Sequence, residues 1–199
     1  AGYSDVEHES MQVILDLASD IAFHSPSVRE IEAADAVLIL GEDVTNVAPR
    51  IALALRQSVR NKAKNLAEES RIPQWQDAAV RELAQYERSP LSILSPAISR
   101  LDDAASDRVI ESLSTVVSMG HQIANKISAS APDAAAFTAY SEVIEKIAIQ
   151  LKAAKRPLII AGNSNGSGVI KAAANIARAL GIDSDRSAID LCLLVPEVN

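Results

Sequence analysis

Two apolar runs in the sequence end at a glycine and are followed by a helical pattern. The first is AVLIL at Ala36–Leu40, before Gly41, and the second is PLIIAG at Pro157–Gly162. Neither run alternates between apolar and polar residues, which is typical of a parallel strand that helices cover on both faces. The repeated order fits either an old duplication or the common arrangement of α/β units. It predicts a doubly wound, mainly parallel, Rossmann-like sheet with helices on both faces.

Other apolar patterns predict the remaining elements of this α/β fold. Helices are expected at about 7–21, 49–69, 73–86, 109–127, 137–154 and 169–180, and further strands at about 89–96 and 188–196. Thr45 or Asn46 is expected to cap the helix that contains Pro49, and Gly181 to end the last helix. Gly120 lies inside the longest apolar stripe and predicts a close contact with another element.

The length of 199 residues allows one large domain or two small ones. The segment SASAPDAAA at Ser128–Ala136 has the composition of a hinge or boundary. We therefore expect a first α/β domain at 1–130 and a second α/β segment, part of an incomplete domain, at 131–199. The sequence begins with Ala1 rather than Met, and we expect it to be a piece of a longer chain.

Charge and cysteine content exclude several functions. The net charge of -7 disfavours nucleic acid, and we interpret the basic run Arg56–Asn65 as a solvated helix face. Cys192 is the only cysteine, so it forms no intrachain disulfide and cannot by itself hold an iron–sulfur cluster. The three histidines are far apart, and no metal site is expected. No apolar run approaches the roughly 20 residues that span a bilayer.

The two glycine turns contain the candidate binding residues. The turn at Gly162–Gly168 matches neither the dinucleotide-binding nor the P-loop pattern, although its backbone N–H groups and the next helix could meet an anion. The competing interpretation is a tight turn that only permits close packing. Any remaining cofactor site would use Gly41, Glu42, Asp43, Gly162, Asn163, Gly166 and Gly168.

The turn after Gly41 argues against a bound nucleotide. Glu42 and Asp43 place two carboxylates where a diphosphate would lie, and like charges repel. These carboxylates are instead expected to stabilise the dipole of the following helix.

No catalytic residue is predicted. Asp102 and Asp103 are adjacent, and we interpret them as a solvated loop or a helix cap. The possible nucleophiles Ser164, Ser167 and Cys192 have no histidine near them in the sequence, and His121 is interpreted as an ordinary helix residue.

The segment EIEAADAVLILGEDVTNVAPRIALALRQ at Glu30–Gln57 resembles the G subunit of bacterial NADH-quinone oxidoreductase, which is the large cluster-bearing subunit of respiratory complex I. PQWQDAA at Pro73–Ala79, SRLDDAA at Ser99–Ala105 and KRPLIIAGNSNGS from Lys155 fit the same match in order. The resemblance implies a fold like that of the molybdopterin oxidoreductases. In those enzymes the turn at Gly41 typically reads G-x-N-P, so Glu42 and Asp43 imply that the pterin site has been lost.

The resemblance also implies what the parent complex does. It would oxidise NADH at a flavin in another subunit and pass electrons along iron–sulfur clusters to quinone in the respiratory chain. The cluster ligands lie in an N-terminal segment that this chain lacks. The fragment would then be a structural, cofactor-free domain that contacts other complex I subunits. Its place would be the cytoplasmic side of the bacterial inner membrane, peripheral and without insertion.

Two rival functions remain open. One is an active molybdopterin- or nucleotide-binding oxidoreductase domain, which would hold an anion at Gly162–Gly168 or Gly41. The other is a freestanding signalling or adaptor module.

Overall fold

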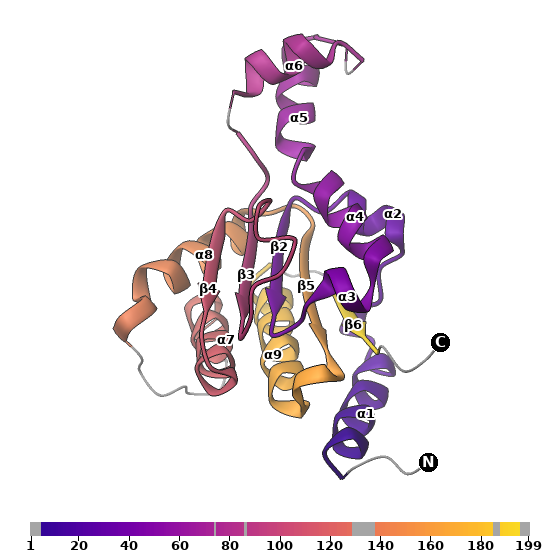
Figure 1. Ribbon diagram of the computed structural model, residues 1–199, viewed down its shortest axis with the longest axis vertical. Helices are drawn as coiled ribbons and strands as arrows, with labels where there is room; N and C mark the ends of the chain where they lie inside the picture. The colour runs from indigo at the N-terminus through magenta and orange to yellow at the C-terminus, as the bar shows by residue number, and fades with distance from the viewer. Residues whose placement is uncertain (1–4, 74, 86, 129–137, 185–187, 196–199) are drawn as a thin grey trace.

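The centre of the molecule is a sheet of six parallel strands in the order β1-β6-β5-β2-β3-β4 (Figure 1). The computed structural model describes residues 5–73, 75–85, 87–128, 138–184 and 188–195. The chain winds outward from β2 through β3 to β4, and β5 and β6 lie on the other side of β2. The predicted doubly wound α/β fold is confirmed. The strands are β1 (Phe23–His24), β2 (Ala36–Leu40), β3 (Leu91–Ser95), β4 (Asp107–Ile110), β5 (Pro157–Gly162) and β6 (Ile189–Leu194).

Helices cover both faces of the sheet. Leu38 and Leu40 on β2 join a core with α1, α7, α8 and α9, whereas Val37 and Ile39 join a second core with α2, α3 and α4. This division follows from the two-residue period of a strand, which sends successive side chains to opposite faces. The helices are α1 (Asp5–Ala18), α2 (Val28–Glu32), α3 (Val44–Val47), α4 (Pro49–Ser58), α5 (Asn61–Glu69), α6 (Asp77–Ala84), α7 (Leu113–Ile127), α8 (Ser141–Ala153) and α9 (Ser167–Ser184).

Gly120 permits close packing of α7 on α9, as predicted. A Cβ atom at position 120 would lie 2.9 Å from the Cβ of Ala172 on α9. Real Cβ atoms essentially never approach so closely, so a side chain here would push the two helices apart.

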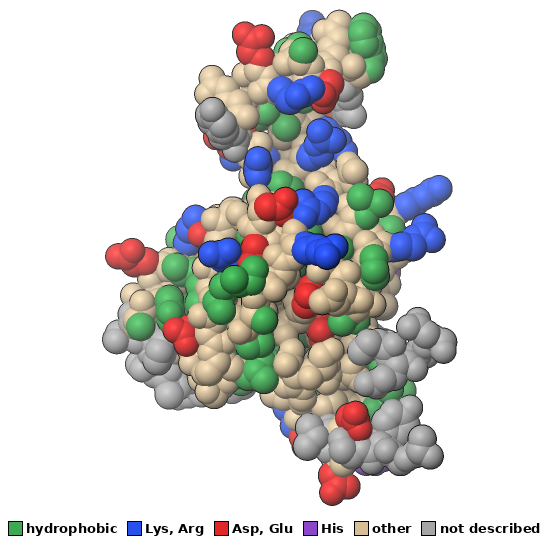
Figure 2. Space-filling view, viewed as in Figure 1, with side chains coloured by type: hydrophobic (Ala, Val, Ile, Leu, Met, Phe, Trp, Pro, Cys, Tyr) green, Lys and Arg blue, Asp and Glu red, His purple; other side chains and the backbone are tan. Residues whose placement is uncertain are grey.

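Helices α5 and α6 project from the body of the molecule, and we call them the arm (Figure 1). The prediction of one helix at 49–69 is wrong, because α4 ends at Ser58 and α5 starts at Asn61, from where it runs in a new direction (Figure 1). Figure 2 shows the arm standing clear of the body, with Lys and Arg side chains gathered over their junction. Trp75, before α6, is 80% exposed.

Several predicted boundaries need correction. Val109 lies in strand β4 rather than in a helix, and α1 ends at Ala18. Gly181 does not end α9, which continues to Ser184. Strand β1 and helix α2 were not predicted. Position 86, expected on the helix opened by Pro73, and position 137, expected at the start of the next helix, lie outside the described residues.

Strands from both expected segments, 1–130 and 131–199, lie in the one sheet, since β2 pairs with β5. Apart from Ser128, the expected boundary at Ser128–Ala136 lies outside the described residues. Within the described part of the chain, no helix is both long and apolar enough to cross a membrane.

Candidate functional site

The strand order reverses between β2 and β5, so their carboxyl ends form the place where doubly wound folds bind ligands. Gly41 follows β2, and Gly162 ends β5. The structure therefore brings the two predicted glycine turns together at one edge, which we call the switch-point edge.

The turn at Gly41 is held closed by its neighbours. Gly41 has φ +69°, a left-handed conformation that favours glycine, and its N–H donates to the carbonyl of Leu94 at 2.7 Å. The side-chain amide of Asn165 donates to the carbonyl of Gly41 and so ties the second turn to the first. Val169 fills the remaining space, because a Cβ at position 41 would lie 3.0 Å from its Cγ1.

Glu42 turns its carboxyl group over Gly162. A Cβ atom at position 162 would lie 2.1 Å from Glu42 Oε2 and 2.9 Å from Glu42 Cδ. Glu42 itself is only 3% exposed. The glycine at the end of β5 thus leaves room for the chain's own carboxylate, in the space where this fold class admits a ligand.

Burial raises the pKa of the Glu42 carboxyl above its ordinary value, and the charge of Asp43 acts in the same direction. Hydrogen bonds from Ser164 and from the backbone of Asp43 oppose this shift. Glu42 Oε2 has no hydrogen-bond partner among the described residues. Leaving a buried acceptor without a hydrogen bond costs free energy, and this cost is largest when the carboxyl is ionised.

Asp43 caps helix α3. Its carboxylate accepts a hydrogen bond of 3.0 Å from the backbone N–H of Thr45 and one of 2.6 Å from the side-chain amide of Asn46. The expected interaction of the carboxylates with the next helix is therefore confirmed for Asp43 but not for Glu42. The prediction that Thr45 or Asn46 caps the helix with Pro49 is wrong, because Ala48 is its N-cap residue and Pro49 its first residue.

The second turn is a short 3-10 helix, η2 (Asn163–Asn165), that leads into α9. Asn163 is buried, and Gly166 has φ +82°, another left-handed conformation. Gly168 is less restricted, since a Cβ there would make only ordinary contact, at 3.5 Å, with Val117. The geometry of this turn therefore requires glycine at Gly162 and Gly166 but not at Gly168.

Glu9 places a second carboxylate at the amino end of α9. Glu9 Oε1 accepts hydrogen bonds of 2.8 Å from the Ser167 hydroxyl and from Lys171 Nζ. The bond from Lys171 is the main cause that lowers the pKa of Glu9. An anion at a helix amino terminus is favourable, and here the protein supplies one itself. Sequence reasoning missed Glu9, because it lies far from α9 along the chain and matches no motif.

The remaining candidates show no catalytic arrangement among the described residues. Burial raises the pKa of the Cys192 thiol to about 11, which keeps it protonated and unreactive. The Nδ1 atom of His121 lies 3.2 Å from the side-chain amide nitrogen of Asn175, and burial lowers the pKa of His121. Asp103 binds Arg56 through two hydrogen bonds, and Asp102 contacts Ser99 and Arg108. No metal-holding group of His, Cys, Asp or Glu occurs in the part of the chain that the structure describes.

The fold and this edge define a doubly wound α/β domain in which the buried Glu42 carboxyl packs over Gly162 at the switch-point edge. Among curated proteins, the chain is similar to part of the G subunit of NADH-quinone oxidoreductase. It is 42% identical to that protein from Pseudomonas fluorescens over an alignment of 201 positions that covers 100% of the chain. It is 42% identical to the same protein from Shewanella oneidensis and 38% to that from Escherichia coli K12, each over 181 residues and 90% of the chain.

These matches confirm the resemblance seen in the sequence. The chain spans 22% of the length of the Pseudomonas fluorescens relative and 20% of the other two. No family model matches the chain.

The fold also occurs in a solved structure of low sequence identity. The formyltransferase/hydrolase complex from Methylorubrum extorquens in complex with methylofuran matches with a TM-score of 0.54 and 16% identity. The match covers 96% of this chain and 45% of that one. It supports the α/β architecture alone.

Proposed function

We propose that this chain is a structural, cofactor-free part of a large subunit of NADH-quinone oxidoreductase. Its relatives carry the name of the G subunit of that enzyme. The observation that supports a cofactor-free role is the Glu42 carboxyl packed over Gly162 at the switch-point edge. In this role the chain supports electron transfer from NADH to quinone by the whole complex and carries no reacting group itself.

The partners in this proposal are the other subunits of respiratory complex I. The place of the chain would be the peripheral part of the complex, on the cytoplasmic side of the bacterial inner membrane. The iron–sulfur clusters would be bound by other parts of the parent subunit. Exposed apolar side chains such as Leu53, Ile98 and Ile149 would then be covered by neighbouring parts of the assembly.

Calorimetry tests the absence of a cofactor. We would titrate molybdopterin guanine dinucleotide and, separately, NADH into the chain at pH 7. The expected result is no binding heat for either compound, because the Glu42 carboxyl packs over Gly162 and the carboxylates of Glu42 and Asp43 would repel a diphosphate. Micromolar affinity for either compound would overturn the proposal in favour of an active cofactor-binding domain.

A variant with Glu42→Ala and Asp43→Ala tests whether these two carboxylates are what prevents binding. It removes both charges from the turn after β2 and reopens the space above Gly162. If the wild-type chain binds nothing and this variant gains weak affinity for the dinucleotide, the carboxylates are what exclude it.

A further inference from the structure

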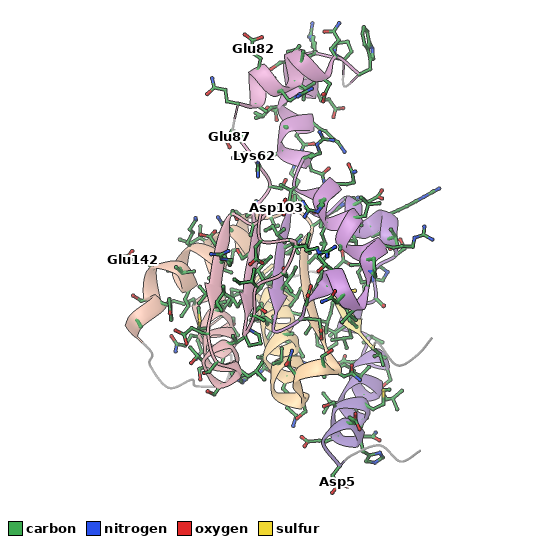
Figure 3. All side chains as sticks on the ribbon, in the orientation of Figure 1. Asp5, Lys62, Glu82, Glu87, Asp103 and Glu142 are labelled. Carbon is green, nitrogen blue, oxygen red and sulfur yellow. The ribbon has the colours of Figure 1, made fainter. Side chains whose placement is uncertain are left out.

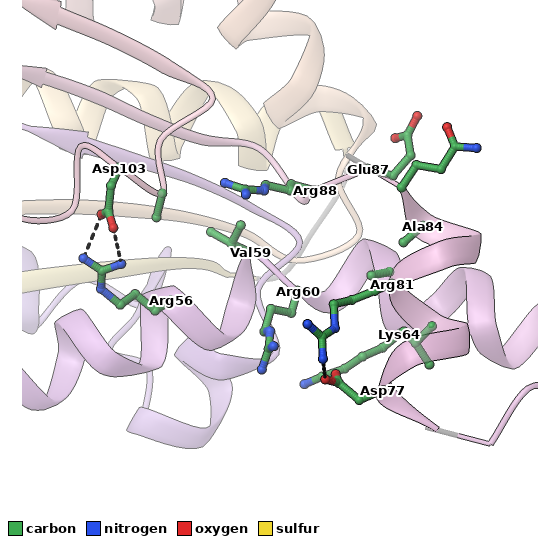
Figure 4. A pocket seen from close by; sticks show the side chains of 14 residues that line it. Arg56, Val59, Arg60, Lys64, Asp77, Arg81, Ala84, Glu87, Arg88 and Asp103 are labelled. Carbon is green, nitrogen blue, oxygen red and sulfur yellow. Dashed lines mark hydrogen bonds and ion pairs between the residues drawn. The ribbon is translucent and has the colours of Figure 1, made fainter. Parts of the chain in front are cut away.

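The base of the arm encloses a groove of about 490 Å³ between α4, α5, α6 and the loop before β4 (Figure 4). We call it the basic groove, because its lining carries more cationic than anionic side chains in a protein whose net charge is -7. Its apolar lining includes Val59, Val80 and Ala84. Its charged lining residues are Arg56, Arg60, Lys64, Arg81 and Arg88, with Asp77, Glu87 and Asp103.

The carboxylates that line the groove are already paired. Asp103 binds Arg56 through hydrogen bonds of 2.8 and 2.9 Å, and Asp77 pairs with Arg81 one helical turn away. Glu87 pairs with Lys62, and Figure 3 shows these two side chains next to each other at the base of the arm. These pairs join α4 to the loop before β4, and α5 to the segment after α6, so they fix the walls of the groove.

Three cationic side chains of the lining form no ion pair with the described residues. Arg60, Lys64 and Arg88 have no carboxylate at ion-pair distance among the described residues. Figure 4 shows Arg60 between the two paired sites, with no interaction drawn to it. Because Arg60 and Lys64 are four residues apart at the start of α5, they lie about one helical turn, roughly 6 Å, from each other.

A protein segment fits this groove better than a polyphosphate does. A compact polyanion concentrates its charge at one place and would also face the carboxylates of Asp77, Glu87 and Asp103. A peptide can place single carboxylates on the free cations and set apolar side chains against Val59 and Val80. The exposed Trp75 on the projecting arm is also typical of a protein contact surface.

We propose that the basic groove binds an acidic, partly apolar segment of a partner protein, with carboxylates one helical turn apart that meet Arg60, Lys64 and Arg88. This interaction surface goes beyond the proposed function and lies apart from the switch-point edge.

The test measures fluorescence anisotropy with a labelled helical peptide of roughly 15 residues, in which Glu recurs every fourth position beside Leu. The groove variant combines Arg60→Glu, Lys64→Glu and Arg88→Glu. A matched variant, Arg29→Glu, Arg50→Glu and Lys155→Glu, changes the net charge equally at exposed positions outside the groove. We expect the groove variant to weaken binding by about tenfold or more and the matched variant by less than about twofold.

Three outcomes would overturn the proposal: no binding of the acidic peptide to the wild-type chain, equal weakening in both variants, or tighter binding of tripolyphosphate that displaces the peptide.

A second peptide with Lys in place of Glu is a control and should not bind. Circular dichroism checks that both variants fold. If the charge reversals prevent folding, Arg60→Ala, Lys64→Ala and Arg88→Ala replace them, with a smaller but still selective loss expected. The calorimetry with cofactors tests the switch-point edge rather than the basic groove, so the proposed function and this proposal can fail independently.

Discussion

The switch-point edge and the basic groove are two places where this molecule could hold an anion, and they differ in how their charges are satisfied. At the edge, the buried carboxyl of Glu42 packs over Gly162, and Glu9 binds the side chains of Ser167 and Lys171 at the start of α9. In the groove, Arg60, Lys64 and Arg88 lack a carboxylate partner among the described residues. The strand-turn-helix unit thus keeps its shape while one of the chain's own carboxyl groups lies over Gly162, whereas these three cationic side chains line the groove.

The two regions should also differ in their tolerance of substitution. The edge depends on buried atoms in close contact, and a methyl group added at Gly162 would clash with them. The groove depends on partly or fully exposed side chains that can be changed without disturbing the core.

Replacing Gly162 with alanine gives the largest expected effect on stability. The new Cβ would meet Glu42 Oε2 at 2.1 Å and the carbonyl oxygen of Leu194 at 3.0 Å. Glu42 must then leave its place, and the strand end must shift. We expect Gly162→Ala to lower the free energy of unfolding by about 1–3 kcal/mol, the usual cost of overpacking, as measured by urea denaturation.

Gly168→Ala is the matched control in the same turn. Its Cβ would be 3.5 Å from Val117, and position 168 lies in the first turn of α9, where alanine is the better helix former. We expect it to be neutral or stabilising by up to about 1 kcal/mol. In a Glu42→Ala background, Gly162→Ala should cost less than half as much. Equal costs in both backgrounds would show that Glu42 does not occupy the space above Gly162.

Glu42→Gln tests the electrostatics of the edge. Because the folded state raises the pKa of Glu42 above 4.5, the protonated form favours folding. That stability is present below pH 4.5 and is lost as the pH rises through the folded pKa. Glutamine stays neutral, so we expect the variant to be more stable than the wild type by about 1 kcal/mol at pH 7, and the difference to vanish near pH 4.

Glu9→Gln should change the free energy of unfolding at pH 7 in the opposite direction to Glu42→Gln. Lys171 lowers the pKa of Glu9, so the wild type should be the more stable protein at pH 7 and lose that advantage as the pH falls through the folded pKa. Both comparisons use thermal unfolding across the pH range. A Glu42→Gln difference that is independent of pH would contradict a raised pKa for this carboxyl.

The sequence predicted the parts of the fold that depend on local pattern. Runs such as Ala36–Leu40 are short, apolar throughout and followed by a glycine, which is typical of a strand covered on both faces. Strand β4 was missed because only Val109 among its four residues is buried, and Val109 happens to stand four residues before Leu113 on α7. The bend between α4 and α5 was missed because the apolar spacing continues across Val59.

The site was predicted only in part, for a different physical reason. The repulsion between the carboxylates and a diphosphate could be read from the turn after Gly41. The packing of Glu42 over Gly162 could not, since it depends on β2 and β5 being neighbours in the sheet. The groove depends on ion pairs such as Arg56 with Asp103, which join segments far apart in the sequence. The basic run was interpreted as a solvated face, and the structure shows that part of it lines a groove.

The smallest expected effect on stability comes from removing the three unpaired cationic side chains of the basic groove. Arg60→Ala, Lys64→Ala and Arg88→Ala remove three cations that have no carboxylate partner among the described residues and that lie near Arg56 and Arg81. Exposed substitutions of this kind usually change the free energy of unfolding by less than about 0.5 kcal/mol each, and here they also relieve repulsion between like charges. We therefore expect urea denaturation of the triple variant to match or slightly exceed the wild type. A loss as large as that of Gly162→Ala would mean that these cations stabilise the fold, and the contrast between the two regions would then be lost.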